Sequence, residues 1–296
     1  MTSQRVTSSV ARPFCLGRHT AAAECPIRRI AATSQKQPRS SLYPADYQRF
    51  EIAATERVAE VALEANIKRF IYTGTIDSYY AGARAGFITE ATPLDPGIER
   101  RNLYARAKAA SEVLLMRMYK EQGLPLVIVR PGVVIGRGGS PYHWGVGMWR
   151  HDGVCEVWGE GRNPLALALV EDVAAGLILT MTTQNIEGRS FNLVGDATLT
   201  AREYLDELDR AAGIRIEGHY TPIVHFYRDD LLKWIVKMLV RHPERRVPSW
   251  RDWEGRTQKA RFDCTAAKTV LGWRPCADRT ELIRRGIDEP VKEFVF

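Results

Sequence analysis

The chain has 296 residues, 45% of them hydrophobic, and is long enough to bury the core of one large domain or two small ones. This composition excludes disorder of the whole chain. No apolar run approaches the roughly 18 residues of a membrane-spanning helix. The five scattered cysteines contain no C-x-x-C pair, which argues against a disulfide framework and a structural zinc site. We therefore expect a reducing compartment, the cytoplasm.

The net charge of +7 is concentrated at the start of the chain. Residues 1–41 hold seven Lys and Arg residues and one acidic residue, which leaves 35 basic and 34 acidic side chains in the other 255 residues. No basic stripe interleaved with aromatic residues follows, so we expect no nucleic-acid partner.

Residues 1–44 are rich in Ser, Thr, Arg, Ala and Gln, include four prolines and show neither period of regular structure. We expect a poorly ordered arm. Its Arg-rich, acid-poor opening is compatible with an organelle transit peptide and equally with a non-native or truncated gene start.

From Tyr47 onward the pattern becomes globular. Residues 46–69 predict an amphipathic helix, with one face formed by Phe50, Ala54, Val58, Val61 and Ala62. A buried strand, "RFIYTGT", then a long helix closed by Gly123 and a second buried strand, "PLVIVRP", follow. Helix, strand, helix and strand with short connections predict parallel strands and the α/β class, in which ligands bind beyond the carboxyl ends of the strands.

After Gly136 the elements become shorter and mixed. We expect a glycine-rich loop, a strand near residues 155–158, a further strand, a helix and the strand "RSFNLVGD". Helices follow near residues 201–212, 227–240 and 280–287. The organisation we expect is an arm at 1–44, a Rossmann-like core at 45–137 plus parts of 165–200, and a substrate lobe at 138–164 and 201–296.

Tyr104 and Lys108 stand four residues apart on the long helix and therefore on one face. An ammonium near a phenol favours phenolate and brings its pKa toward the range useful for proton transfer at a carbinol oxygen. Y-x-x-x-K also occurs by chance on many helices. The strand before it delivers Thr73, Gly74 and Thr75 to the carboxyl edge of the sheet, where a hydroxyl can share a substrate oxygen with the phenol; an ordinary Thr/Gly turn is the alternative.

At this point the chain resembles the extended short-chain dehydrogenases/reductases, the NAD-dependent epimerase/dehydratase superfamily, from about Tyr47 to the C-terminus. The similar segments, in order, are "FEIAATERVAEVALEANIKRFIYTGT", "YARAK", "VIVRPGVVIG", "VWGEGRNPLALALVEDVAAGL" and "AAKTVLGWRP". The resemblance implies a Rossmann-like parallel sheet with a smaller substrate lobe.

The resemblance also implies roles for individual residues. Tyr104 would be the general acid/base, and Lys108 would lower its pKa and hydrogen-bond the nicotinamide ribose of NAD or NADP. Thr75 would orient the substrate oxygen. The implied cofactor site combines the catalytic pair with the two strand ends, through Tyr104, Lys108, Thr73, Gly74, Pro131 and Gly132, the last two beside the nicotinamide.

The sequence departs from the family in three places. The family's first strand carries G-x-x-G-x-x-G, which meets the cofactor pyrophosphate, whereas the only glycine before Gly74 is Gly17. Before the helix at Tyr47 the family needs roughly 65 to 80 residues, and 46 are present. We therefore expect an N-terminally incomplete sheet and impaired cofactor binding. Glu51 is the second departure, since many members have Asn there.

The third departure concerns the substrate. Sugar-nucleotide members usually have Asn where this chain has Val133, and Arg-Asp where it has Leu165 and Ala166. The implied activity is NAD(P)-dependent oxidation, reduction, epimerisation or dehydration at a carbinol or keto carbon. The substrate is left open between a nucleotide sugar and an apolar alcohol of the hydroxysteroid or flavanol type. An inactive remnant or binding module of the same fold is the alternative, and a homodimer is possible.

Other candidate groups are weaker. Four histidines lack metal-ligand spacing, so we expect no metal site, and Ser140 lies in no G-x-S-x-G elbow. Core packing is the first interpretation of Trp144, Trp149 and Trp158, and lining of a substrate pocket is the second. The apolar helix from Leu231 to Arg241 carries a cationic stripe. Packing in the lobe is favoured for it, with contact to a membrane surface or cover of the substrate mouth as alternatives.

Overall fold

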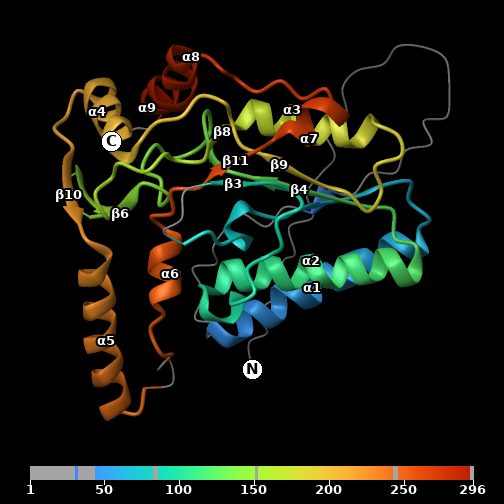
Figure 1. The fold of residues 1–296 in the computed structure, drawn as a ribbon, viewed down its shortest axis with the longest axis horizontal. Coiled ribbons are helices and arrows are strands. Elements are labelled where there is room, and N and C mark those ends of the chain that lie inside the picture. Colours follow the sequence, from blue (N-terminus) through green and yellow to red (C-terminus); the bar gives the residue numbers. More distant parts are fainter. Residues whose placement is uncertain (1–30, 33–43, 83–85, 151–152, 243–245, 294–296) are drawn as a thin grey trace, which may run out of the picture.

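The computed structural model describes residues 31–32, 44–82, 86–150, 153–242 and 246–293 (Figure 1). Its central sheet has the strand order β1-β2-β4-β9, and every neighbouring pair is parallel. The strands are β1 (Ala31–Ala32), β2 (Phe70–Thr73), β4 (Leu126–Pro131) and β9 (Ser190–Leu193). The α/β class with a parallel sheet is therefore confirmed.

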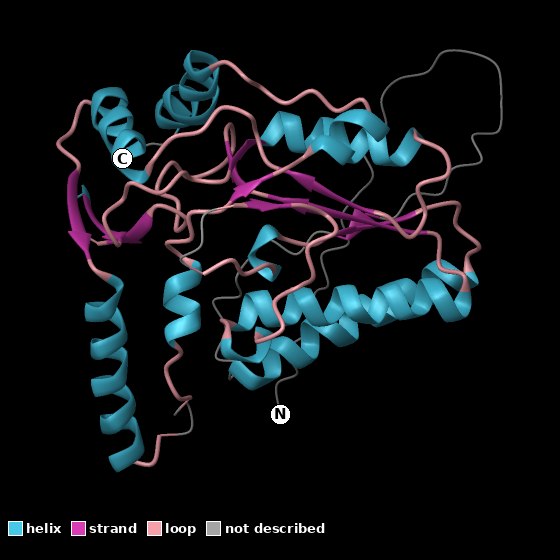
Figure 2. Cartoon of the chain, viewed as in Figure 1, coloured by secondary structure: helices cyan, strands magenta, loops and turns pink. Residues whose placement is uncertain are grey.

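Helices cover both faces of this sheet (Figures 1 and 2). Side by side on one face lie α1 (Pro44–Glu64) and α2 (Leu103–Gln122), and on the other lie α3 (Val170–Thr182) and α7 (Thr265–Val270). Helix α2 begins where the Asn102 side chain accepts a hydrogen bond from the Ala105 N–H, and it ends at Gly123, whose φ of 74° suits glycine. Both ends of α2 match the sequence prediction.

The buried face of α1 matches the predicted one only in part, since Ala62 is buried as predicted and Val58 is half-buried against the core. Phe50 and Val61 are exposed, and Ala54 is exposed too, whereas Ala59 and Ala62 are fully buried. Helix α1 packs against α2, and Ala59 and Ala62 belong to the core cluster that these helices form with the sheet. The core between these helices and the sheet includes Phe70, Leu115, Met118, Leu126 and Ile128.

A second group of elements lies at the carboxyl edge of the sheet. Strand β7 (Val154–Trp158) pairs antiparallel with β6 (Gly147–Trp149) and parallel with β10 (Glu217–Thr221). Two short parallel pairs join β5 (Val133–Ile135) to β8 (Leu167–Leu169) and β3 (Phe87–Ile88) to β11 (Arg261–Phe262). Helix α4 (Ala201–Ala212) begins with a capping box, and the chain then runs through α8 (Arg279–Ile283), a π-helical turn (Arg284–Asp288) and α9 (Glu289–Glu293).

Helix α5 (Ile223–Leu239) projects from the body of the protein beside the short α6 (Trp250–Gly255) (Figure 1). The structure describes every residue of α5, and among them only Phe226 is buried. The packing of this helix into the lobe, favoured from the sequence, is therefore wrong, because α6 covers only one side of it. No helix in the described part of the chain is long and apolar enough to span a bilayer.

The range predicted as an arm, 1–44, contains strand β1, whose Ala31 and Ala32 pair with Ile71 and Tyr72 of β2. Apart from β1 and Pro44, which begins α1, this range lies outside the described residues.

Candidate active site

Tyr104 and Lys108 occupy the first two turns of α2, on one side of the helix. Lys108 is buried, and its Nζ lies 3.2 Å from Glu51 Oε1 of α1 and 3.4 Å from the Thr73 carbonyl oxygen of β2. The Lys108 ammonium also lies 5.3 Å from the ring centroid of Tyr72. Its ammonium is therefore fixed by two elements, and Glu51, noted as a departure, supplies the compensating charge.

Thr75 follows β2 and caps the 3₁₀ turn Ile76–Ser78. The backbone N–H of Gly74 donates to the Val129 carbonyl at 2.8 Å, which continues the pairing of β2 with β4 up to this point. The Thr75 hydroxyl oxygen accepts a hydrogen bond from the Asp77 N–H at 3.2 Å. This bond holds the side chain in place and leaves the hydroxyl hydrogen available to donate to another acceptor.

A cavity of about 700 Å³ lies beyond the carboxyl ends of β2 and β4. Of the site residues predicted from the sequence, Thr75, Tyr104 and Gly132 line it. The structure thus brings together the hydroxyl, the phenol and the glycine that follows β4. Lys108, Thr73, Gly74 and Pro131 adjoin these residues in the chain but are not among the described residues that line the cavity.

The glycines at positions 74 and 132 are explained by packing within the protein. A Cβ on Gly74 would lie 2.2 Å from Glu112 Oε1, and a Cβ on Gly132 would lie 2.2 Å from the Ala166 carbonyl oxygen. Both approaches are shorter than a real Cβ contact allows. Glycine is therefore needed at both strand ends whether or not a cofactor approaches them.

A buried ionic network beneath Gly74 was not predicted from the sequence. Arg130 of β4 donates to Glu112 of α2, with Nη2 at 2.7 Å and Nε at 2.9 Å from Oε2, and its Nη1 donates to the Tyr79 hydroxyl at 2.6 Å. That hydroxyl in turn donates to Asn192 Oδ1 at 3.2 Å. Burial raises the pKa of Glu112, against the attraction of Arg130, and raises the pKa of Tyr79 to about 12. The network fixes α2 against β4 under the cavity.

A second cluster ties α6 to the same strand end. Arg101 is almost fully buried and forms ion pairs with Asp77, with Asp95 at 3.4 Å and with Asp252 at 3.5 Å. Asn102 Nδ2 donates to Asp77 and to Asp252, each at 3.1 Å. The turn after β2, the start of α2 and helix α6 are thereby held in one arrangement.

Of the described residues, Asp77, Arg137 and Arg256 are the charged ones that line the cavity. Arg256 lies 5.0 Å from the ring centroids of both Trp158 and Trp253, while Arg137 pairs with Glu293 at 2.9 Å. His143 also lines the cavity. Burial lowers the pKa of His143, and its Nδ1 accepts the Gly145 N–H at 2.9 Å; both favour the neutral imidazole.

The remaining wall is largely apolar and aromatic. Val133, Leu165 and Ala166, the positions that depart from the family pattern, all line the cavity. Trp144 and Trp158 line it too and stack with ring centroids 6.2 Å apart, whereas Trp149 packs edge-on against Tyr142. Trp158, only 3% exposed, is a core residue that also lines the cavity, the half-buried Trp149 packs against the core beside it, and the exposed Trp144 fits the pocket-lining interpretation best.

Several site residues escaped the sequence prediction. Asn102 was detectable as the polar residue before an apolar helix, which is the signal of an N-cap. No signal of comparable strength marks Asp77, Arg137 or Arg256. The pairing of Glu112 with Arg130 spans two elements, and only the fold brings it together.

A parallel sheet covered by helices on both faces, with a cavity beyond the carboxyl ends of its strands, is the arrangement of the Rossmann-like α/β class. Residues 26–194, more than half of the chain, match the model of the NAD-dependent epimerase/dehydratase family. The chain belongs to that family.

Relatives and solved structures agree with this assignment. The chain is 25% identical over 253 residues to a dTDP-glucose 4,6-dehydratase of Streptomyces antibioticus, covering 84% of this chain and 65% of that protein. It is 27% identical over 168 residues to protein y4nG of Sinorhizobium fredii, covering 55% and 40%. The matched segments thus span less than two thirds of either relative. The structure of a UDP-glucuronic acid 4-epimerase from Bacillus cereus, in complex with UDP-glucuronic acid and NAD, shares the fold, with a TM-score of 0.60 and 18% identity over 82% of this chain and 67% of that one.

Proposed function

We propose that this chain is a nucleotide-sugar epimerase or dehydratase that uses an NAD-type cofactor. The observation that carries the proposal is the convergence of Thr75 and Tyr104 on one cavity at the carboxyl edge of the sheet, with Lys108 fixed one helical turn further along α2. The names of the dehydratase and epimerase to which the chain is similar support the same substrate class.

In the proposed mechanism, Tyr104 exchanges the proton of the substrate's carbinol hydroxyl, and the oriented Thr75 hydroxyl donates a hydrogen bond to the same oxygen. The Lys108 ammonium stabilises negative charge that develops on the phenolic oxygen. Bound NAD supplies the acceptor and donor of a hydride. Tight packing around Gly74 and Gly132 fixes the backbone at the two strand ends beside the cavity.

The described residues fit the nicotinamide end of such a cofactor. Lys108, one helical turn from Tyr104, contacts the Thr73 carbonyl oxygen, and Gly132 lines the cavity; both observations support this assignment. Residues 44–73 contain no glycine, so this described stretch supplies no glycine-rich turn for a pyrophosphate. We expect the nicotinamide half of the cofactor to be held by α2, β2 and β4.

The cavity rim supports a nucleotide diphosphate. The Arg256 guanidinium, which lies 5.0 Å from the ring centroids of Trp158 and Trp253, and Arg137 outnumber Asp77 among the charged lining residues and can bind a pyrophosphate. The exposed Trp144 offers a flat surface for a base. The apolar wall at Val133, Leu165 and Ala166 favours a second candidate, a more apolar alcohol or ketone. Competition by UDP and dTDP for substrate turnover separates the two, because only a nucleotide-sugar enzyme has a subsite for the nucleotide.

The test is Tyr104→Phe, assayed with UDP- and dTDP-hexoses and NAD for epimer exchange and for formation of keto sugar. We expect turnover to fall by about 10²- to 10⁴-fold, the usual contribution of a positioned acid/base, while circular dichroism shows an unchanged fold. Tyr119→Phe, further along the same helix, is the matched control and should keep wild-type turnover.

A Tyr104→Phe variant with wild-type turnover removes the acid/base assignment. If the wild-type chain binds neither NAD nor a nucleotide sugar by calorimetry and turns over neither substrate class, the alternative is supported instead, namely an inactive member of the family.

A further inference from the structure

Glu51 places a buried carboxylate beside the candidate catalytic pair. Its Oε1 lies 3.2 Å from the Lys108 ammonium, and the two side chains are only 12% and 6% exposed. A buried ion pair gains little net free energy, because the loss of hydration offsets much of the attraction between its charges. Stability alone therefore explains this pair poorly, and its place one helical turn from Tyr104 points to a role in the chemistry.

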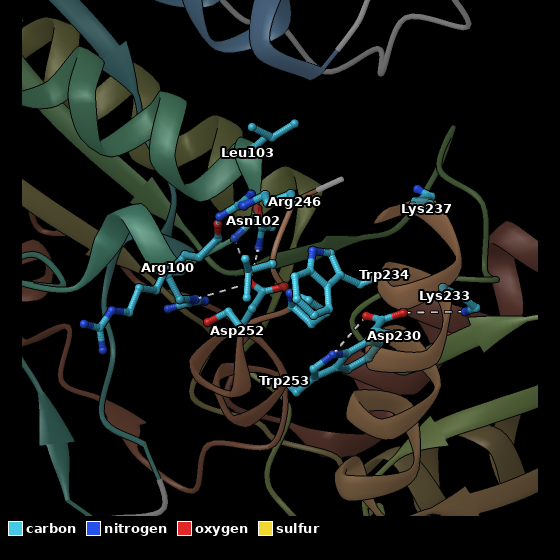
Figure 3. A pocket seen from close by; sticks show the side chains of 14 residues that line it. Arg100, Asn102, Leu103, Asp230, Lys233, Trp234, Lys237, Arg246, Asp252 and Trp253 are labelled. Carbon is cyan, nitrogen blue, oxygen red and sulfur yellow. Dashed lines mark hydrogen bonds and ion pairs between the residues drawn. The ribbon is translucent and has the colours of Figure 1, made fainter. Parts of the chain in front are cut away.

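The position of α2 is fixed by other contacts as well. The helix begins beside a pocket of about 310 Å³, where the Asn102 N–H and Nδ2 donate to Asp252 of α6 at 2.8 and 3.1 Å (Figure 3). Further along the helix, Glu112 joins α2 to Arg130 of β4. These contacts hold α2 on both sides of the buried ion pair, so the distinct contribution of Glu51 is its negative charge.

Other titratable groups face Lys108 from β2 and from α2 itself. Tyr72, whose ring centroid lies 5.3 Å from the ammonium, stays a neutral phenol because burial raises its pKa. The Glu112 carboxylate also attracts Lys108, but its direct partner is Arg130 at 2.7 Å. Among the described residues, Glu51 is thus the carboxylate that contacts Lys108.

A negative charge makes each neighbouring group hold its proton more tightly. Tyr104 and Lys108 lie on one side of α2 within a turn of each other, so we treat them as a coupled pair that titrates together. The Lys108 ammonium favours loss of the phenolic proton, and the Glu51 carboxylate opposes that loss. The balance of the two charges sets the pH at which the pair can accept a proton from a substrate.

We propose that Glu51 is a positioning residue that keeps the Tyr104–Lys108 pair in its protonated form at neutral pH, ready to donate a proton to a keto oxygen. Glu51 is not among the described residues that line the cavity, so it acts through Lys108. The inference rests on the function proposed above. Reduction of a keto carbon takes one proton from this pair and one hydride from the reduced cofactor, whereas oxidation of a carbinol needs a pair that has already lost its proton.

Titration of the Tyr104 phenol tests the inference without substrate or cofactor. The ultraviolet absorbance of tyrosinate is followed against pH for each chain and for the same chain carrying Tyr104→Phe, and the difference isolates Tyr104. Glu51→Gln removes the charge and keeps the shape of the side chain. We expect its midpoint about one pH unit or more below that of the wild type, the usual effect of one charge within about 4–6 Å.

The pH profile of turnover is the second readout. With a UDP- or dTDP-hexose and NAD, the pH at which kcat/KM for carbinol oxidation rises should fall in Glu51→Gln by about the same amount. A purely structural role of Glu51 would instead lower turnover at every pH and leave the profile in place. Glu51→Asp, which keeps the charge, should retain a midpoint and a profile near those of the wild type.

Glu60→Gln is the matched control, because Glu60 lies on the same helix and pairs with Arg57 at the surface, with its side chain 44% exposed. Its midpoint should equal that of the wild type. Circular dichroism verifies folding, and Glu51→Asn is a second neutral variant if Glu51→Gln does not fold. A midpoint that stays at the wild-type value or rises in the folded neutral variants overturns the inference. If the midpoint falls but the wild-type chain turns over neither substrate class, the proposed function fails and the effect of Glu51 on the pair stands.

Discussion

In most proteins apolar side chains are buried and charged side chains are exposed. The end of strand β2 and the far half of α5 both depart from this rule, each in a different way. Around β2, charged groups that normally face water are buried, among them Arg101, Lys108, Glu112 and Arg130. On α5, the apolar residues that normally fill a core are exposed, with Leu239 at 79%. One region has its charges inside, and the other has its hydrophobic surface outside.

The difference shows what stabilises each region. Every buried cation around β2 has a carboxylate partner in the structure, and such pairs fix geometry more than they add free energy. The network therefore keeps Thr75 and α2 in one position. Helix α5 gains nothing from its outward face, and only its root, at Phe226, contributes to the fold. The buried network adjoins the candidate active site, where Thr75 lines the cavity.

The largest expected effect comes from breaking the buried pair. Arg130→Met leaves the Glu112 carboxylate, only 2% exposed, without its cation, and we expect the free energy of unfolding to fall by about 3–5 kcal/mol. Urea denaturation followed by circular dichroism measures it. Arg150→Met is the control, because Arg150 pairs with Glu156 at the surface with its side chain 54% exposed, and there the loss should stay below about 1 kcal/mol.

The double variant Arg130→Met/Glu112→Leu sharpens the result. It removes both charges, so most of the lost stability should return. If the double variant is as unstable as the single one, the loss comes from disrupted packing and not from an unpaired charge.

Local signals explain which elements could be predicted from the sequence. The ends of α2 and α4 carry caps within a few residues, Asn102 with Gly123 and Thr200 with Gly213, and both helices appear where expected. The short elements β10, α6, β11 and α7 were not predicted separately, since tertiary contacts hold them and local propensity is weak. The family pattern located Tyr104 and Thr75.

Long-range pairing explains what the sequence could not show about the site. Glu51 was recognised only as an unusual residue, and its partner Lys108 is 57 positions away along the chain. From the sequence alone, Arg130 in a central strand would be expected to contact solvent or a ligand. Only the fold shows that it pairs with Glu112. Arg256 reaches the cavity because α6 is tied to Asn102 and Arg101 by Asp252, and no periodicity encodes that link.

An intermediate effect is expected at Asp95, which links Arg101 before α2 to Arg251 of α6. Its carboxylate is fully buried and accepts hydrogen bonds from Arg251 Nε at 2.9 Å and from the Gly97 N–H at 2.8 Å. Burial by itself raises the pKa of Asp95, but these hydrogen bonds outweigh it and hold the pKa below its usual 3.8. A depressed carboxyl pKa adds stability that is present above pH 3.8 and is lost as the pH falls through the folded-state value.

Asp95→Asn should therefore lower the free energy of unfolding at pH 7 by about 1.5–3 kcal/mol, the usual contribution of charged hydrogen bonds. The gap between variant and wild type should narrow as the pH falls below about 4, since the wild-type carboxylate then becomes protonated. Thermal unfolding across this range measures both curves. The control is Asp229→Asn, at an exposed position on α5, which should have the stability of the wild type at every pH. If the stability difference between Asp95→Asn and the wild type stays constant down to acid pH, then Asp95 is not stabilised in its ionised form.

The smallest effect is expected at the tip of α5 and tests the other half of the comparison. Leu239→Ser removes a side chain that has almost no cover from its own chain, so the free energy of unfolding should change by less than about 0.5 kcal/mol. Leu115→Ala, a leucine fully buried between α2 and the sheet, should by contrast lose about 2–5 kcal/mol. Both are measured by urea denaturation at two protein concentrations. A loss at Leu239 that exceeds about 1 kcal/mol and grows with protein concentration would mean that a second copy covers this part of α5, because only a contact between chains depends on concentration.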